Sequence, residues 1–227
     1  MSLAKVFIEH YADELEEIKK YTQQIDIWQQ NMQRERFKND LINSLEDMGY
    51  ENLDLGRLVN EHLNNSDWYV GGIHEAFPQL LIKSLFLSAY SCLEICLSEV
   101  TEIIHREQNL LLKPSDLRGR GVLRALLYLR KVVLLPMLDD CELIKEIQAL
   151  NMLRNFYAHD GKNHIKSKSQ EYQAAKKFGI VRDEATKTLG IVELYLDKEF
   201  LNKALYTINL LLTYIRQGVI DKYMTPH

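Results

Sequence analysis

The sequence predicts a mostly α-helical protein, and three observations support this fold class. The 227 residues include only 10 glycines and 4 prolines, about half the usual combined share of roughly 12%. That is too few turn-forming residues for a turn-rich β-sandwich or barrel. Apolar residues recur at steps of three and four over long stretches, as on one face of a helix. Hydrophobic residues at 46% and charged residues at 26% are ordinary globular values.

The N-terminal region predicts one long helix over residues 3–48, a stretch without glycine or proline. Gly49 is a natural stop for this helix. A shorter helix is predicted over residues 53–63, followed by a loop over residues 64–72. Residues 1–70 are therefore expected to form an N-terminal helical extension. The apolar positions that predict the long helix are Leu15, Ile18, Tyr21, Ile25, Trp28, Met32, Phe37, Leu41, Leu45 and Met48.

A second group of helices is predicted over residues 78–217, beginning with a buried helix over residues 80–106. A break at residues 113–116 separates it from a helix that reaches about Val133. Ser115 or Asp116 would cap that helix, because their side-chain oxygens accept hydrogen bonds from the first turn. The helix over 80–106 carries a narrow polar stripe, formed by Ser91, Glu94, Ser98, Thr101 and His105.

Two further helices complete the expected bundle. One starts near Asp139 and ends near His159, with Gly161 as a left-handed stop. The last is capped by Asp197 and continues through Ile215.

The stretch between these helices is polar and poorly periodic. Residues 160–188 are expected to form a mobile basic rim rather than core. Residues 178–181 and 189–196 could form two short strands of a β-hairpin, because the second is rich in β-branched and aromatic residues.

The charge of the chain is unevenly distributed. The net charge of −4 excludes a polycation of the histone type. Locally, residues 113–131 hold six basic residues and one acidic residue, and residues 162–177 hold five and one. These segments are either solvated helix faces or a phosphate-binding surface. The candidate RNA-binding residues within them are Arg118, Arg120, Lys162, His164, Lys166 and Lys168.

Cysteine usage and hydropathy bear on location and cofactors. Cys92, Cys96 and Cys141 are odd in number and fit small buried hydrophobic positions in a reducing compartment. No CxxC pair or Cys/His cluster is present, so neither a metal nor another cofactor is expected. No uncharged apolar run approaches a membrane span, and no signal-peptide pattern is visible. A cytoplasmic protein with no membrane partner is expected.

The strongest candidate for chemistry lies at the end of the fourth predicted helix. On an ideal helix with Asn151 at 0°, Asn155 falls at about 40°, His159 at about 80° and Arg154 at about −60°. Ala158 falls at about −20°, inside this arc. The four polar side chains therefore share one face, with a small residue near its centre.

These residue types suit RNA cleavage without a metal. An imidazole exchanges protons near neutral pH, and it could serve a 2′-oxygen or a leaving 5′-oxygen. The guanidinium of Arg154 would neutralise charge that develops on the phosphorus centre. Asn155 could hold the imidazole or a ligand hydroxyl. The alternative is an exposed polar helix face without catalytic function.

The run Arg154-Asn155-Phe156-Tyr157-Ala158-His159 resembles the signature of the HEPN superfamily, in which Arg, often followed by Asn, precedes His by four to six residues. Residues 88–94 are similar to the first core helix of that family, and residues 195–201 are similar to its last helix start. The resemblance covers residues 78–217.

This resemblance implies an antiparallel helical bundle that forms a homodimer, with two Arg…His motifs facing one cleft. Many such proteins are metal-independent endoribonucleases of toxin–antitoxin or defence systems, and a cognate antitoxin or nucleotidyltransferase is then a possible partner. The family often adds an acidic residue from an earlier helix, for which Glu94 is the candidate; a purely structural carboxylate is the alternative. Other members are catalytically silent modules that bind a nucleotide or a protein.

Overall fold

The computed structural model describes residues 3–47, 73–135, 142–159, 164–183 and 190–223. Within these ranges, side chains are described except at residues 3, 26, 28–47, 73–78 and 183. The described α-helices are α1 (Leu3–Asp47), α3 (Ile73–Glu107), α4 (Gly121–Lys131), α5 (Glu142–His159), α6 (Gln170–Phe178) and α7 (Lys198–Tyr223). One 3₁₀ turn and three short strands join them: η1 (Pro114–Asp116), β1 (His164–Lys166), β2 (Val181–Asp183) and β3 (Ile191–Leu194). The mostly helical fold class is confirmed.

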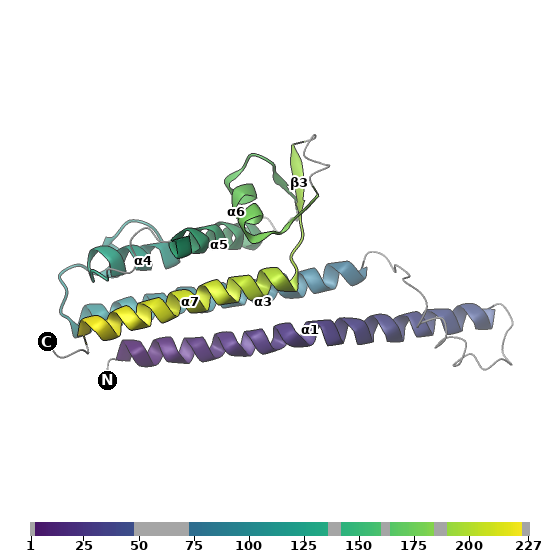
Figure 1. Ribbon diagram of the computed structural model, residues 1–227, viewed down its shortest axis with the longest axis horizontal. Helices are drawn as coiled ribbons and strands as arrows, with labels where there is room; N and C mark the ends of the chain where they lie inside the picture. The colour runs from purple at the N-terminus through teal and green to yellow at the C-terminus, as the bar shows by residue number, and fades with distance from the viewer. Residues whose placement is uncertain (1–2, 48–72, 136–141, 160–163, 184–189, 224–227) are drawn as a thin grey trace.

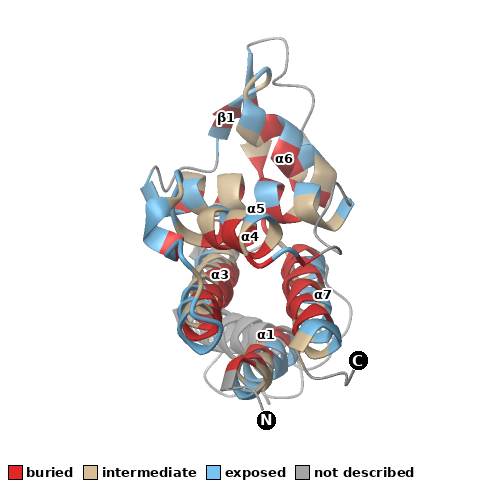
Figure 2. Ribbon diagram, turned by 90° about the vertical axis from the view of Figure 1, so that its left-hand side faces the viewer, coloured by how far each residue is buried: buried red, intermediate tan, exposed pale blue. Residues whose placement is uncertain are grey.

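The long helices α1, α3 and α7 lie side by side, and α4 and α5 form a layer above them (Figure 1). Seen from the end, their buried sides face a common centre (Figure 2). The first half of α1 contributes Ile8, Leu15 and Ile25 to the same core as the later helices. Polar contacts reinforce this packing, because Tyr11 Oη donates to Glu99 Oε2 of α3 at 3.3 Å.

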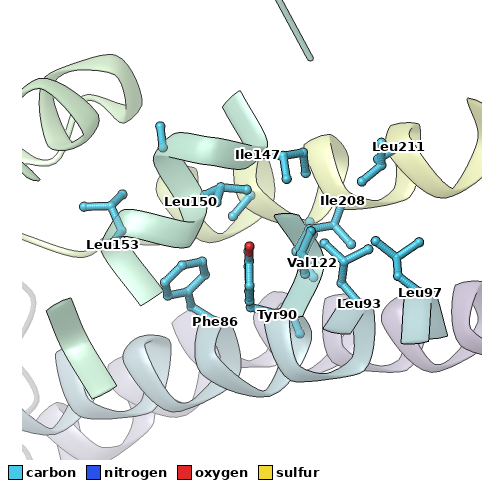
Figure 3. Close-up of a cluster of buried hydrophobic side chains, with 14 of the residues drawn as sticks. Phe86, Tyr90, Leu93, Leu97, Val122, Ile147, Leu150, Leu153, Ile208 and Leu211 are labelled. Atoms are coloured by element: carbon cyan, nitrogen blue, oxygen red, sulfur yellow. The ribbon is translucent and has the colours of Figure 1, made fainter. Parts of the chain in front are cut away.

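The centre of the core lies between α3, α5 and α7 (Figure 3). Figure 3 shows Leu153 above the Phe86 end of α3 and Ile147 toward the Leu97 end, so α3 and α5 run antiparallel. Each labelled side chain is at most 1% exposed, and burying such residues is the main stabilising contribution to a bundle. They are Phe86, Tyr90, Leu93, Leu97, Val122, Ile147, Leu150, Leu153, Ile208 and Leu211.

Helix α4 begins later than the sequence predicted. Neither Ser115 nor Asp116 caps it, because Asp116 belongs to η1, where its Oδ2 accepts from the backbone N–H of Lys113 at 2.8 Å. The N-cap of α4 is Arg120. The reason lies in the next residues: Gly119 and Gly121 have positive φ angles of 99° and 56°, which turn the chain before the helix starts.

The other long helices occur where the sequence predicted them, but α3 begins at Ile73 rather than Leu80 and α7 continues beyond Ile215 to Tyr223. Helix α5 ends at His159, and the N-terminal helix α1 ends at residue 47. Asp197 caps α7 as predicted, since its Oδ1 accepts from the N–H of Phe200 at 2.7 Å. The predicted helix 53–63 and loop 64–72 lie outside the described residues, as do Asp139, Cys141 and Gly161.

The prediction that residues 160–188 lie outside the core is wrong for residues 164–183. Helix α6 packs on α5 and buries Tyr172, Ala175 and Phe178. Phe178 makes an edge-to-face contact with Phe200 of α7, with ring centroids 6.0 Å apart. Helix α6 was not predicted because its buried face is formed by Tyr172, Ala174, Ala175 and Phe178 in a short segment that also holds Lys176 and Lys177, so its apolar periodicity is weak.

A three-stranded antiparallel sheet is formed by β1, which precedes α6, and by β2 and β3, which follow it; the strand order is β1-β3-β2. The β2–β3 pair lies within the predicted hairpin region 178–196. The first strand of the predicted hairpin corresponds to β2, which starts at Val181 and not at residue 178. The reason is that Phe178 is the last residue of α6, and Gly179 forms the left-handed C-cap of that helix with φ 74°. Strand β1 pairs with the other side of β3, and the sequence did not predict it.

In the described part of the chain, one helical segment is long and apolar enough to cross a membrane by length and composition, Gln79–Glu107 of α3. This segment packs against α1, α4, α5 and α7. Contacts with four other helices are typical of an apolar helix in the core of a helical bundle.

We expect Ile8→Ala to lower the free energy of unfolding by about 2–5 kcal/mol, the usual cost of truncating a fully buried aliphatic side chain. Ile8 is 1% exposed in α1. Because α1 shares one core with the other helices, urea unfolding followed by circular dichroism should show one shifted transition. Val6→Ala, at a 38% exposed position of the same helix, should change it by only about 0.5 kcal/mol. Two separate transitions would contradict a shared core.

Candidate active site on helix α5

Helix α5 presents two different faces. Leu150, Leu153 and Tyr157 are buried, whereas Asn155 and His159 are exposed. The segment contains no glycine or proline, and its apolar spacing of three and four fixes this orientation. Asn155, Ala158 and His159 of the predicted polar arc therefore face solvent, whereas Asn151 and Arg154 are partly buried and contact α3.

Arg154 is held by two side chains. Its Nη2 lies 2.9 Å from Oε2 of Glu94 on α3, and its Nη1 donates to Oδ1 of Asn155 at 3.1 Å. The side chains of Arg154 and Glu94 are 28% and 34% exposed. Solvent at such a site screens the charges, so the pair contributes only up to about 1 kcal/mol to folding. Its main effect is to fix the plane of the guanidinium.

Gly121 makes room for the carboxylate of Glu94. A Cβ atom at Gly121 would lie 2.3 Å from Glu94 Oε1, which is closer than van der Waals contact allows. The residue also has φ 56°, a conformation that favours glycine. The Glu94 carboxylate is thus placed between Arg154 and the first turn of α4.

This contact brings the basic turn of the sequence analysis to the site. Arg120 is the N-cap of α4, directly before Gly121, and both Arg118 and Arg120 are exposed. Sequence reasoning named these arginines but missed Gly121. The only sequence signal at Gly121 is that a glycine follows each of the two arginines. This pattern predicts a turn, but it does not predict that Gly121 lies next to Glu94.

Tyr90 forms a second link between α3 and α5. Its hydroxyl donates to Oδ1 of Asn151 at 3.1 Å. Burial, and to a smaller extent the nearby Glu94 carboxylate, raises the pKa of Tyr90 above its ordinary value. The hydroxyl therefore stays protonated and remains a donor. The spacing of Tyr90 and Glu94, one helical turn apart, places both on the side of α3 that faces α5.

His159 is the last residue of α5 and is exposed, one turn beyond Asn155. The remaining candidates follow in sequence: His164 and Lys166 are exposed on β1, and Lys168 is exposed just after it. Lys162 lies outside the described residues. Within the described ranges, none of them forms a hydrogen bond or ion pair with Glu94 or Arg154.

The cysteines and metal-ligand types do not assemble a second centre in the part of the chain that the structure describes. No group of three His, Cys, Asp or Glu side chains suited to a metal occurs there. Cys96 is fully buried, and burial raises the pKa of its thiol to about 12. Cys92 is half-buried, and burial raises the pKa of its thiol as well. Both are unreactive thiols at neutral pH.

Comparisons with protein-family models, curated proteins and solved structures found no match to this chain. Any function proposed for it rests on its own residues and their geometry.

We expect Gly121→Ala to destabilise the protein more than Gly179→Ala. Both glycines have positive φ, so both alanines incur a backbone cost of about 1–2 kcal/mol. Only at Gly121 does the new methyl also displace a side chain, since nothing lies within 4 Å of a Cβ at Gly179. Urea unfolding of the two variants measures the difference.

The same comparison in a Glu94→Ala background is the control. Without the Glu94 side chain, Gly121→Ala should cost no more than Gly179→Ala. A cost at Gly121 that stays unchanged in that background would show that the methyl group does not act through Glu94.

Proposed function

We propose that this protein is a metal-independent endoribonuclease of HEPN type. One observation carries the proposal: Arg154 is oriented by Glu94 and Asn155, and the exposed His159 lies five residues further along the same helix. Within the run that carries the HEPN resemblance, Asn155, Ala158 and His159 are exposed and Arg154 is partly exposed, whereas Tyr157 belongs to the core. A guanidinium of fixed plane and a solvent-accessible imidazole are the groups that phosphate-ester cleavage needs.

In the proposed reaction, the ribose 2′-oxygen attacks the adjacent phosphorus. The O2′–P bond forms while the P–O5′ bond breaks, which leaves a 2′,3′-cyclic phosphate and a 5′-hydroxyl. The 2′-hydroxyl gives up its proton and the departing 5′-oxygen receives one. The His159 imidazoles of the two protomers in the proposed dimer make these two transfers, and Arg154 stabilises the negative charge on the phosphorus centre. Glu94 acts as a positioning residue, because its carboxylate contacts Arg154 and lies against Gly121.

A toxin or phage-defence effector in the cytoplasm is the biological role that this chemistry fits. RNA is then the substrate, and a cognate antitoxin or a nucleotidyltransferase is the expected protein partner. The second candidate function is a catalytically silent module that binds a nucleotide or protein. The internal pairing of Arg154 with Glu94 favours it, because that carboxylate already occupies the guanidinium.

Cleavage of RNA by the purified protein should proceed in EDTA, since the proposed chemistry uses only side chains. His159→Ala should lower the rate by about 10²–10⁴ through loss of the proton-transfer group. Arg154→Ala should be comparably severe through lost charge stabilisation. His10→Ala, at an exposed histidine of α1, is the matched control and should retain full activity. Equal rates for wild type and His159→Ala, with both folded by circular dichroism, would refute the mechanism.

A homodimer should form in solution, because one chain supplies one imidazole and one guanidinium, and a two-fold axis doubles both. Ile95, beside Glu94 on α3, is a 49% exposed apolar residue that fits an interface next to the site. Light scattering should give twice the 26.6 kDa chain mass. Ile95→Asp should shift it toward monomer, while Ile27→Asp on α1, 62% exposed, should not. A monomeric wild type at micromolar concentration would contradict the two-chain site.

A further inference from the structure

We infer that the outward face of the β1-β3-β2 sheet binds single-stranded RNA and guides it to Arg154 and His159. This inference rests on the proposed ribonuclease function. It adds the strandedness of the substrate and a binding surface formed by Arg182, Tyr195, Lys166 and Ile191.

The two faces of the sheet differ in character. Ile165, Val192 and Leu194 point inward and are at most 6% exposed. The alternation of side chains along the strands turns their neighbours to the other face. On β1 these are His164 and Lys166, both exposed.

On the two other strands, Ile191 of β3 is 49% exposed and Arg182 of β2 is exposed. The register places Lys166 opposite Ile191, and His164 opposite Glu193. An apolar side chain with a cation directly across from it can contact a base and the adjacent phosphate together.

Arg182 and Tyr195 form a stacked pair on this face. The guanidinium carbon of Arg182 lies 4.4 Å from the centroid of the Tyr195 ring. The backbone N–H of Tyr195 donates to the carbonyl of Ile180 at 2.8 Å, which anchors the ring at the end of β3. Nucleobases stack both on aromatic rings and on arginine planes, so such a pair provides a planar surface for an unpaired base.

The charge of this face suits a phosphate backbone. Lys166 and Arg182 lie on it, and Lys168 follows β1. Among the outward-facing side chains that the structure describes, Glu193 is the carboxylate, and its cross-strand neighbour is His164. Among the side chains that the structure describes on this face, Lys166 and Arg182 therefore outnumber Glu193; the Cα of Asp183 pairs with that of Glu193, and its side chain is not described.

The covalent chain keeps this face near His159. Five residue steps separate His159 from His164, so their Cα atoms lie no more than about 18 Å apart. An extended strand of a few nucleotides spans this distance. A duplex would hide its base faces from Tyr195 and Arg182, whereas a single strand exposes them.

The test is binding of a fluorescein-labelled 2′-O-methyl oligouridine of about ten nucleotides, followed by anisotropy. The methylated 2′-oxygen prevents the proposed attack, so binding is measured without cleavage. Tyr195→Ala and Arg182→Ala should each weaken binding about 5- to 150-fold, the range for loss of one stacked base. Tyr195→Phe should bind like wild type, because the ring is retained. Lys166→Ala should reduce the slope of log affinity against log salt by about 0.7.

Tyr206→Ala, at a 68% exposed tyrosine of α7, is the matched control and should not change binding. The inference fails if Tyr195→Ala and Arg182→Ala bind as tightly as this control. It also fails if a duplex probe binds as tightly as the single-stranded probe. Displacement of the RNA by polyglutamate of the same total charge would likewise contradict the inference and would assign the face to an acidic protein.

The two proposals fail in different ways. Tyr195-dependent binding without any RNA cleavage by wild type would refute the ribonuclease and leave the single-strand surface. Cleavage that depends on His159, combined with binding that ignores Tyr195 and Arg182, would do the reverse. Circular dichroism shows whether Tyr195→Ala is folded, and Tyr195→Phe keeps the aromatic ring. Together these two variants separate loss of stacking from loss of folding.

Discussion

The burial of α3 is the constraint on which the rest of the structure depends. Four helices, α1, α4, α5 and α7, pack against it, because its apolar residues cover most of its circumference. The polar contacts between α3 and its neighbours form at the edge of its apolar surface. Glu94 lies at such an edge, where the start of α4 and the middle of α5 meet α3, and Gly121 and Arg154 both contact its carboxylate.

Much of the fold could be predicted from the sequence, and the failures have one physical origin. Apolar residues at steps of three and four predicted α1, α3, α5 and α7, because a helix with one buried face carries apolar residues at that spacing. Helix α6 was missed because its buried face consists of Tyr172, two alanines and Phe178 among lysines. Alanine carries little hydropathy signal, yet its small side chain lets α6 approach α5 closely.

The candidate site was predictable where it depends on one helix and not where it depends on several. The spacing of Asn151, Arg154, Asn155 and His159 fixes their common face through helix geometry alone. The contact of Arg154 with Glu94 joins residues 60 positions apart, and the role of Gly121 depends on the packing of a third helix. A local sequence pattern does not indicate contacts between residues that lie so far apart in the chain. Glu94 is a candidate because the family resemblance implies a polar or acidic residue from an earlier helix and because Glu94 is central in the polar stripe of that helix.

The two links between α3 and α5 differ in strength, and the difference bears on function. Tyr90 is buried and Asn151 is half-buried, so their hydrogen bond is partly shielded from water, and breaking it would leave the buried hydroxyl without this partner. The Glu94–Arg154 pair lies in partial contact with solvent, where an ion pair is worth at most about 1 kcal/mol. Packing and the Tyr90 contact therefore fix the position of α5. The weaker ion pair sets only the orientation of the guanidinium. Under the proposed function, an incoming phosphate, itself a strong acceptor for arginine, would replace the carboxylate without disturbing the bundle.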